Sequence, residues 1–345
     1  MKIGLVSSAV PLVFGGGRFI VDWLREKLEE RGHAVETVFI PTVDTPEILI
    51  QQMAAFRLMR LENHFERVIT FRPPAHVVRH PCKVVWFIHH VRYLYDLWDS
   101  EHRPFADLAP HRALRDTVVR ADTAALKEAR HLFTNSRVVS DRVRRFNGLE
   151  SEVLYPPVLR PELFAAGEYG NEIVSVCRVE RHKRQHLLIE AMRHVRTPVR
   201  LRLCGTGLDT NYMQSLRRLA EESGAADRIA IEDAWITEEE KAARLEGALA
   251  SAYVPYDEDS YGYPTIEAAH ARRCTVTVSD AGGVAEFVRH GETGLTAAPA
   301  PVELAAAFDR LHADRALARR LGDNAAVRVA ELGIDWDTVI EKLLA

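Results

Sequence analysis

The sequence predicts an α/β protein made of two doubly wound domains that face each other across a cleft. Short apolar strands alternate with amphipathic helices along the chain, which is typical of parallel sheets covered by helices. The 345 residues exceed what one hydrophobic core usually holds, so two domains are expected. Pro156 and Pro157 cannot both lie in a central strand and stiffen an extended connector. We therefore place the domains at residues 1–158 and 170–330.

Composition argues against several classes of protein. Lys and Arg number 45 against 49 Asp and Glu, giving a formal charge of −4 and no overall attraction to nucleic acid. The 4 cysteines are widely spaced, which favours reduced, buried thiols over a metal site. The chain opens directly as a strand rather than as a signal peptide, and no apolar run reaches membrane-spanning length. We expect a cytoplasmic protein.

The first half begins with a βαβ unit. Residues 2–7 form an apolar strand, a helical pattern follows, and residues 35–40 form the next strand. The turn after the first strand contains Gly15-Gly16-Gly17, at the sheet edge where such folds bind ligands. These glycines lack the spacing of a dinucleotide fingerprint, and a tight turn explains them equally well.

Further strands are predicted at residues 68–71, 83–88 and 131–136. The second of these ends in His89-His90, and polar residues at the carboxyl end of a parallel strand face the ligand crevice. His89 is therefore a site candidate, although either histidine can simply cap the strand. Ser136 suits the N-cap of a helix at residues 138–146.

The second half repeats the α/β rhythm, and its first strand, residues 172–177, leads into a basic loop. Arg178 ends that strand and Lys183 lies five residues further on. Charge runs usually form solvated loops, and we expect Arg181 and Arg184 to face solvent. Fixed cations such as Arg178 and Lys183 can stabilise negative charge that develops on a leaving phosphate.

An acidic loop precedes a sharply defined helix start further along. An apolar strand at residues 249–254 runs into Asp257-Glu258-Asp259 and then Tyr261-Gly262-Tyr263-Pro264. Pro264 suits the first helical position, and Gly262 lets backbone approach a ligand. The helix start offers N–H groups and a positive dipole to a phosphate. Asp259 and Glu267 would repel phosphate but can bind sugar hydroxyls, so the stretch describes a nucleotide-sugar site.

The stretch from Asp259 to Glu267 resembles the paired-acid element of retaining GT-B glycosyltransferases, family four (glycosyltransferase group 1). This family usually has Glu where Asp259 stands, and its fold is a pair of Rossmann-like domains. The resemblance implies that Asp259 contacts the donor sugar and that Glu267 contacts the ribose. It also implies that the amides between them bind the diphosphate, which singles out Tyr261, Gly262 and Tyr263. Residues 280–288 resemble the next family element, with Glu286 at its acidic position.

Residues 176–192 resemble the family's strand, Arg, loop, Lys, helix element, which implies that Arg178 and Lys183 contact the diphosphate. The family binds the base with backbone at positions corresponding to Gly205, Trp235 and Ile236. Ala234 stands where Gly is usual, so this position does not distinguish a site for uracil from a site for guanine. His89 would touch the sugar or place the acceptor, so the predicted catalytic set is His89, Arg178, Lys183 and Asp259. Gly16 and Gly17 would approach the phosphates or acceptor, and the last helix, 334–345, would cross back onto the first domain.

We expect neither metal nor cofactor. Asp257-Glu258-Asp259 spells the Asp-x-Asp that holds a metal in GT-A enzymes, but Arg178 and Lys183 already supply positive charge beside the phosphates. Asp335-Trp336-Asp337 is explained by an acidic helix N-cap.

The resemblance implies a retaining transferase that moves a hexose from a UDP- or GDP-sugar to a saccharide or lipid-linked acceptor, in cell-surface polysaccharide or glycoconjugate synthesis. Trp98, Arg103, Arg112 and Arg115 can meet such an acceptor or be ordinary surface. Such enzymes can also associate with the inner face of the membrane. A nucleotide-sugar epimerase of the same fold needs acidic residues in the first domain that do not stand out. A third alternative is a binding module without catalysis, slightly favoured by Asp259.

Overall fold

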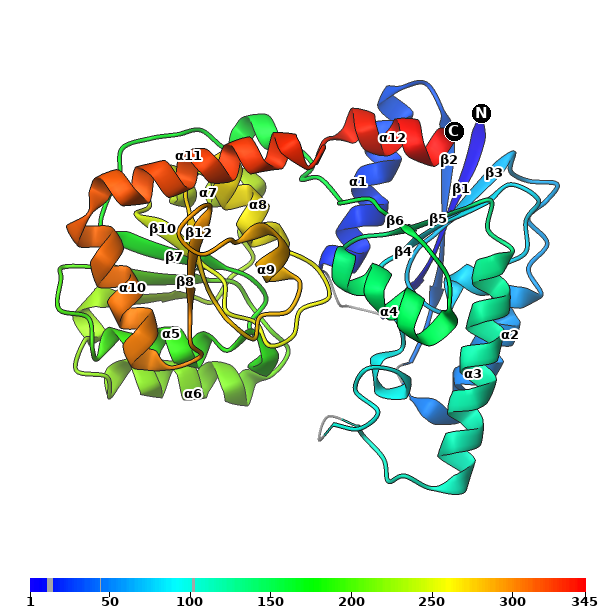
Figure 1. Ribbon diagram of the computed structural model, residues 1–345, viewed down its shortest axis with the longest axis horizontal. Helices are drawn as coiled ribbons and strands as arrows, with labels where there is room; N and C mark the ends of the chain where they lie inside the picture. The colour runs from blue at the N-terminus through cyan, green and yellow to red at the C-terminus, as the bar shows by residue number, and fades with distance from the viewer. Residues whose placement is uncertain (11–14, 44, 101–102) are drawn as a thin grey trace. The chain divides into compact units, whose positions relative to one another are not determined.

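The computed structural model describes residues 1–10, 15–43, 45–100 and 103–345. The chain divides into two compact units (Figure 1). Unit 1 consists of Met1–Pro156 with Ile334–Ala345, and unit 2 of Pro157–Gly333. The chain therefore passes from one unit to the other between the two prolines on which the sequence-based boundary rests.

Unit 1 is built on a parallel sheet. Its described strands are β1 (Lys2–Ala9), β2 (Ala34–Pro41), β3 (Arg67–Thr70), β4 (Lys83–Phe87), β5 (His131–Thr134) and β6 (Glu152–Val153), in the order β2-β1-β3-β4-β5-β6. β3 and β4 are buried along their whole length, as strands covered by helices on both faces must be. β1 pairs with β2 on one side and β3 on the other, so the winding reverses there.

The helices of unit 1 are α1 (Gly16–Glu30), α2 (Leu49–Arg57), α3 (Ala109–Lys127), α4 (Arg137–Asn147) and α12 (Trp336–Leu344). The Ser136 Oγ accepts a hydrogen bond of 3.1 Å from the Val139 N–H, which confirms the predicted N-cap of α4. The Arg67 guanidinium, at the start of β3, donates to the carbonyls of Leu343 and Ala345 at 2.7 and 3.0 Å. α12 is thereby held against the amino-terminal edge of the sheet, opposite the edge where parallel folds bind ligands.

Unit 2 repeats this architecture. Its described strands are β7 (Glu172–Val176), β8 (Arg200–Cys204), β9 (Ile229–Glu232), β10 (Ala250–Ala252), β11 (Thr275–Val278) and β12 (Gly294–Ala297), all parallel, in the order β12-β11-β10-β7-β8-β9. Two doubly wound parallel α/β units are what the sequence predicts. β10 is shorter than the expected strand at residues 249–254.

The helices of unit 2 form a layer on each face of its sheet. They are α5 (Gln185–Met192), α6 (Thr210–Glu221), α7 (Glu238–Glu246), α8 (Tyr263–His270), α9 (Val284–Phe287), α10 (Pro301–Ala313) and α11 (Arg315–Glu331). α5 packs against α6 and α10 on one face, while α8 packs against α11 on the other (Figure 1). Helix α8 begins at Tyr263, so Pro264 occupies the second helical position rather than the predicted first.

Residues 159–169, which the sequence leaves outside both domains, belong to unit 2, and so do residues 157 and 158, which the sequence places in the first domain. The fully buried guanidinium of Arg273 stacks 3.9 Å from the centroid of the Tyr169 ring and donates to the Gly167 carbonyl at 2.8 Å. Arg315 donates to the Tyr169 carbonyl at 3.0 Å. These cations fix the stretch to the unit through its backbone, which an apolar pattern in the sequence does not reveal.

Candidate functional site

The candidate site lies at the carboxyl edge of the sheet of unit 2. β7 pairs with β8 on one side and with β10 on the other, which is the topological switch point where open α/β sheets bind ligands. The loop after β7 carries Arg178 and Lys183, and the loop after β10 carries Asp259. Because β7 and β10 are neighbours in the sheet, these two loops start side by side although they are far apart in the sequence.

Arg184 holds these loops together. Its guanidinium forms a two-pronged ion pair with Asp280, at 2.6 and 2.8 Å, and donates to the carbonyls of Val254 and Pro255 at 3.0 and 2.6 Å. The side chain is only 13% exposed. The prediction that Arg184 faces solvent is therefore wrong, because its partners follow two other strands. Arg181, 70% exposed, does face solvent.

Lys183 is buried against Tyr253 and Glu258. Its Nζ donates to the Tyr253 hydroxyl at 2.8 Å and forms an ion pair with the Glu258 carboxylate. The Tyr253 hydroxyl also donates to Glu258 at 2.8 Å. Burial alone would raise the pKa of Glu258, but the charge and hydrogen bonds of Lys183 and Tyr253 lower that pKa to about 2. The carboxylate is ionised at neutral pH, and sequence reasoning missed its role.

Arg178 also has a carboxylate partner. Its guanidinium contacts the Glu180 carboxylate at 2.5 Å, and the other oxygen of Glu180 lies 3.2 Å from His182. The Gln185 side-chain amide donates to the Arg178 carbonyl at 2.8 Å and so fixes the backbone from which this side chain starts.

The start of α8 meets the Lys183 cluster at Tyr253. Gly262, the N-cap of α8, has a φ of 73°, and a Cβ on it would lie 2.2 Å from Tyr253 Cε1. Glycine is required here because the ring occupies the space of a side chain. The Tyr253 ring thus touches the helix start, and its hydroxyl binds the Lys183 ammonium. Lys183 and the start of α8, which the sequence assigns to one diphosphate, thus both contact Tyr253 within unit 2.

The aromatic residues around Gly262 are largely structural. Tyr261 is 1% exposed and packs against Phe287 with the ring centroids 6.4 Å apart. Tyr263 is half-buried, and burial together with the Glu267 and Glu238 charges raises the pKa of its hydroxyl well above the usual value. The Tyr261 side chain is withdrawn into the core, so this residue can offer a ligand only its backbone.

Glu267 lies in the first turns of α8 and is 2% exposed. Its carboxylate accepts a 2.6 Å hydrogen bond from Lys241 of α7, which also contacts Glu238 at 2.8 Å. Burial alone would lower the pKa of Lys241, but the two carboxylates outweigh it and raise that pKa. Lys241 thus holds Glu267 in place, a pairing that no sequence pattern indicates because 26 residues separate the partners.

The predicted base-binding residues follow β8 and β9. A Cβ on Gly205 would lie 2.0 Å from the Cys177 carbonyl oxygen, so close packing against the loop after β7 explains this glycine by itself. Trp235 is 58% exposed, and Ile236 is half-buried. The Trp235 indole is thus exposed on the loop that follows β9.

Asp259 and Glu286 are both half-buried; Asp259 lies on the loop after β10, and Glu286 lies in α9, just after a segment that contacts this loop. The Glu258 N–H donates to the Ala281 carbonyl at 3.1 Å, and the Gly283 N–H donates to the Glu258 carbonyl at 2.8 Å. A Cβ on Gly282 would lie 2.6 Å from the Glu258 backbone, which requires glycine. The loop that carries Asp259 is thus fixed to the segment that leads into α9 and Glu286.

In unit 1, His89 and His90 follow β4 but have different surroundings. His89 is half-buried, and its Nδ1 lies 2.7 Å from the His90 carbonyl oxygen. The His90 ring is 1% exposed, its centroid lies 4.2 Å from that of the tilted Tyr95 ring, and it contacts the Asn147 side chain at 2.9 Å. Burial lowers the pKa of His90 to about 4. His90 is a neutral core residue, whereas His89 lies at the sheet edge.

Gly16 and Gly17 are the first residues of α1 rather than part of a loop. The Gly15 carbonyl accepts from the N–H groups of Arg18 and Phe19 at 2.8 and 3.0 Å, which starts the helix there. A Cβ on Gly17 would lie 3.2 Å from Ile88 Cδ1, so this helix start packs beside the residue that precedes His89. Residues 11–14 of the same segment lie outside the described residues.

The acceptor candidates divide between core and surface. Trp98 is 4% exposed, and the guanidinium carbons of Arg103 and Arg115 lie 4.9 and 4.8 Å from its ring centroid. Arg112 forms an exposed ion pair with Asp107 at 3.1 Å. Trp98 is therefore a buried side chain whose ring contacts two guanidinium groups, and not a surface aromatic residue.

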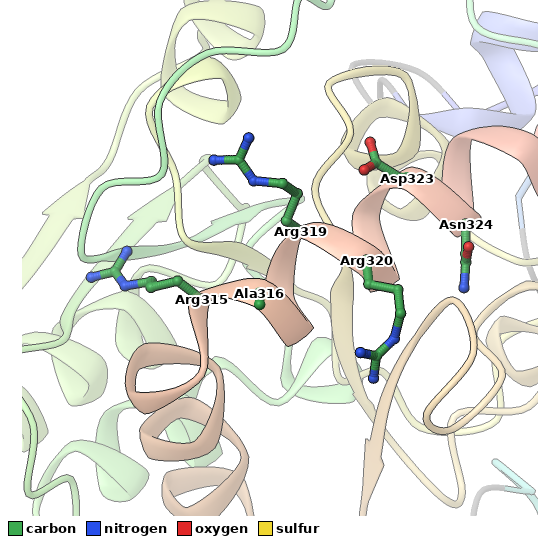
Figure 2. A pocket seen from close by; sticks show the side chains of 6 residues that line it. All are labelled: Arg315, Ala316, Arg319, Arg320, Asp323 and Asn324. Carbon is green, nitrogen blue, oxygen red and sulfur yellow. The ribbon is translucent and has the colours of Figure 1, made fainter.

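A hollow on α11 is separate from this site. Figure 2 shows three guanidinium groups that spread away from one another around the helix, and none of the predicted site residues lines the hollow. The lining residues are Arg315, Ala316, Arg319, Arg320, Asp323 and Asn324.

The described residues contain neither a metal-binding cluster nor a membrane-spanning helix. In residues 1–10, 15–43, 45–100 and 103–345, no three His, Cys, Asp or Glu side chains are grouped in a way that could hold a metal ion. Across the same ranges, the helices are too short or too polar to span a bilayer.

Residues 163–328, nearly all of unit 2, match the family described as Glycosyl transferases group 1. Unit 2 belongs to glycosyl transferase group 1. The family predicted from the paired-acid and Arg–Lys elements is thus confirmed, and those elements lie inside the matched segment. No curated protein sequence matches the chain.

The whole chain is similar in fold to solved GT-B glycosyltransferases. Sucrose-phosphate synthase from Thermosynechococcus elongatus has a TM-score of 0.78 and 19% identity, with 99% of this chain and 97% of that chain covered. The Anabaena protein HepE, in complex with UDP and glucose, has a TM-score of 0.71 and 16% identity over 99% of both chains. A glycosyltransferase from Rickettsia africae has a TM-score of 0.73 and 14% identity over 99% and 98%. At these identities the likeness establishes the GT-B fold.

Proposed function

We propose that this group 1 glycosyltransferase moves a hexose from a nucleotide diphosphate sugar to a saccharide or lipid-linked acceptor, with retention of configuration. The observation that carries the proposal is the meeting of Lys183, Tyr253 and Gly262. A buried ammonium and an open helix start share one aromatic neighbour, so one diphosphate can be reached by both. Cell-surface polysaccharide or glycoconjugate synthesis is the setting that we propose.

The chemistry that the site serves is departure of a nucleoside diphosphate. Negative charge grows on the leaving oxygen as the bond to the anomeric carbon breaks. Cations and N–H donors already fixed in position lower the barrier to that step most. In our proposal, Arg178, Lys183 and the first N–H groups of α8 take this role, Asp259 and Glu286 bind sugar hydroxyls, and Glu267 binds the ribose. Trp235, Ile236 and the backbone at Gly205 meet the base.

The proposed route to retention uses the leaving group itself. The acceptor hydroxyl attacks on the side from which the diphosphate departs, and a phosphate oxygen takes the proton. The route requires no carboxylate nucleophile, and we assign none. Arg178 and Lys183 keep the departing diphosphate close enough to accept that proton, which is a positioning effect as much as an electrostatic one.

His89 is proposed to contact the sugar or to place the acceptor. A carbonyl oxygen only accepts hydrogen bonds, so the 2.7 Å contact with His90 O requires the proton of a neutral His89 to be on Nδ1. Nε2 is then an acceptor, suited to a sugar hydroxyl. Gly16 and Gly17, at the start of α1, are proposed to approach the phosphates or acceptor.

We propose UDP- or GDP-sugars as donors and no metal or other cofactor. HepE, one of the similar folds, is described in complex with UDP-glucose, which makes that donor the first to test. The protein is proposed to work in the cytoplasm, with peripheral contact to the inner membrane face when the acceptor is lipid-linked. The net charge of −4 favours no nucleic acid partner.

A thermal-shift screen of the full chain with UDP-, GDP- and ADP-sugars tests donor binding, since a ligand that binds the native state raises the melting temperature. The donor that stabilises the protein is then incubated with and without candidate acceptors. A transferase releases the nucleoside diphosphate in quantity only when acceptor is present. An epimerase converts the donor without acceptor, and a binding module releases nothing. Absence of any stabilising nucleotide sugar would contradict the proposal.

A further inference from the structure

Both cations proposed to meet the diphosphate already contact carboxylates. Lys183 is paired with Glu258, and Arg178 with Glu180 at 2.5 Å. Each positive charge is therefore balanced by a negative one. A diphosphate adds at least two negative charges to a cluster that is close to neutral, so the cations cannot bind it fully while they hold both carboxylates.

The pairing of Glu258 with Lys183 is built into the fold. The Glu258 backbone is hydrogen-bonded to Ala281 and Gly283, and Gly282 leaves no room for a side chain beside it. The carboxylate accepts from both Lys183 and Tyr253 and is 20% exposed. Such a carboxylate is fixed in position next to its cation, unlike a surface residue that finds a partner by chance.

The pairing of Arg178 with Glu180 is looser. These side chains are 37% and 29% exposed, and Glu180 also lies 3.2 Å from His182. Water reaches both groups, so exchange of Glu180 for another anion costs less than exchange of Glu258. One carboxylate is therefore a strong competitor for its cation and the other a weak one.

We propose that Glu180 and Glu258 are internal counterions that compete with the diphosphate for Arg178 and Lys183. The inference rests on the proposed function, and it adds that the two carboxylates lower the affinity of the site for the nucleoside diphosphate. Donor binding releases the two cations from their carboxylates. After transfer, the carboxylates recover the cations and favour departure of the nucleoside diphosphate. Both residues act through the cations, as positioning residues rather than catalytic ones.

The test compares binding of UDP and GDP by calorimetry to the full chain and to three variants. Glu258→Gln keeps the size of the side chain and removes its charge, and we expect tighter binding by about tenfold. Glu180→Gln should tighten binding by about threefold, because that pair is more exposed. Glu221→Gln, an exposed residue of α6, is the matched control for loss of one negative charge and should leave affinity unchanged. Damage to a site weakens binding, so tighter binding is a result that a structural role alone does not produce.

Turnover provides a second readout. If the counterions drive release, Glu258→Gln lowers KM for the donor and lowers kcat, since the nucleoside diphosphate leaves more slowly. Binding by Glu258→Gln that equals or falls below that of Glu221→Gln overturns the inference while leaving the proposed function intact. If Glu258→Gln does not fold, the affinity of Glu180→Gln decides. Failure of wild type to bind UDP, GDP or a nucleotide sugar overturns the proposed function, and the inference with it.

Discussion

The carboxyl edges of the two sheets use polar side chains in opposite ways. In unit 2, Lys183, Arg178 and Arg184 form ion pairs with carboxylates from the same or neighbouring loops. In unit 1, His90 contacts Asn147 at 2.9 Å, inside a cluster of aromatic rings. Ion pairs at a loop edge can be exchanged for a bound phosphate, whereas a neutral buried pair can only be kept or broken. Unit 2 thus has an edge suited to electrostatic binding, and unit 1 a rigid support for His89.

The buried network around His90 in unit 1 also includes polar side chains of α3 and of the segments after β3 and β4. Asp122 accepts a 2.6 Å hydrogen bond from the Tyr95 hydroxyl and lies 2.9 Å from His76 Nε2. Asn147 donates to the Thr123 hydroxyl at 2.8 Å, so its side-chain oxygen is the acceptor for His90. Asp122 and Thr123 both lie in α3 and Asn147 ends α4, so the network links these two helices to the segment after β4 that carries His89.

Among the changes that test the difference between the ion-paired edge of unit 2 and the neutral network of unit 1, removal of the Lys183 charge should have the largest effect. We expect Lys183→Ala to lower the rate of acceptor-dependent nucleotide release by at least about a hundredfold at saturating donor, because a fixed charge at the leaving group is lost. The same change leaves Glu258 buried without its cation, at a cost in stability of about 3 kcal/mol. The double variant Lys183→Ala/Glu258→Gln removes that cost and should be equally inactive.

Arg181→Ala is the matched control, because Arg181 lies on the same loop and is 70% exposed. It should retain most of the activity. If the double variant folds and turns over at the wild-type rate, Lys183 has no role at the diphosphate and the electrostatic account of unit 2 is wrong.

As the pH falls, His90 in unit 1 should lose its contribution to folding stability before Glu258 in unit 2 does. Burial lowers the pKa of His90 to about 4 from the 6.5 expected in the unfolded chain. Between these values the unfolded state binds the proton more strongly, so stability is full above pH 6.5 and is lost as the pH falls toward 4. The loss reaches about 3 kcal/mol at the lower end of this window. Melting temperatures measured from pH 7 to pH 4 should fall less steeply for His90→Gln, which keeps a hydrogen-bond donor without titrating. The exposed His64→Gln is the control, and an unchanged slope in His90→Gln contradicts the prediction.

Arg184→Lys tests how far the loops of unit 2 depend on one guanidinium. Lysine cannot reproduce the two-pronged contact with Asp280 together with the bonds to two carbonyls. We expect a loss of about 2 kcal/mol and a melting temperature lower by several degrees, with weaker donor binding. Arg181→Lys, on the same loop, should change neither quantity. A melting temperature equal to that of wild type would mean that the backbone alone holds the loops.

The sequence predicts most of the fold and only part of the site, for a physical reason. Strands and helices follow from periodicity within a dozen residues, and Ser136 and Gly262 act through neighbours close in the chain. Helix α2 and strand β12 are absent from the sequence-based assignment of elements. Partners such as Glu258 for Lys183 and Lys241 for Glu267 come from other strands and helices. Arg184 was assigned to solvent for the same reason, since charge runs predict solvation unless a partner from elsewhere is known.

The smallest expected difference between the two edges is the loss, at low pH, of the stability that the Lys183–Glu258 ion pair contributes. The folded-state pKa of Glu258 is about 2, against 4.5 in the unfolded chain, so this pair contributes stability above pH 4.5 that is lost as the pH falls toward 2. The carboxylate is 20% exposed, and solvent screening reduces the contribution to about 1 kcal/mol. Glu258→Gln should therefore melt with a weaker dependence on pH below 4.5 than wild type does, and should match its slope between pH 5 and 7. Because His90 titrates at higher pH, the two windows distinguish a buried neutral support from an exchangeable ion pair. A change in slope only above pH 5 would show that Glu258 is not held ionised by Lys183.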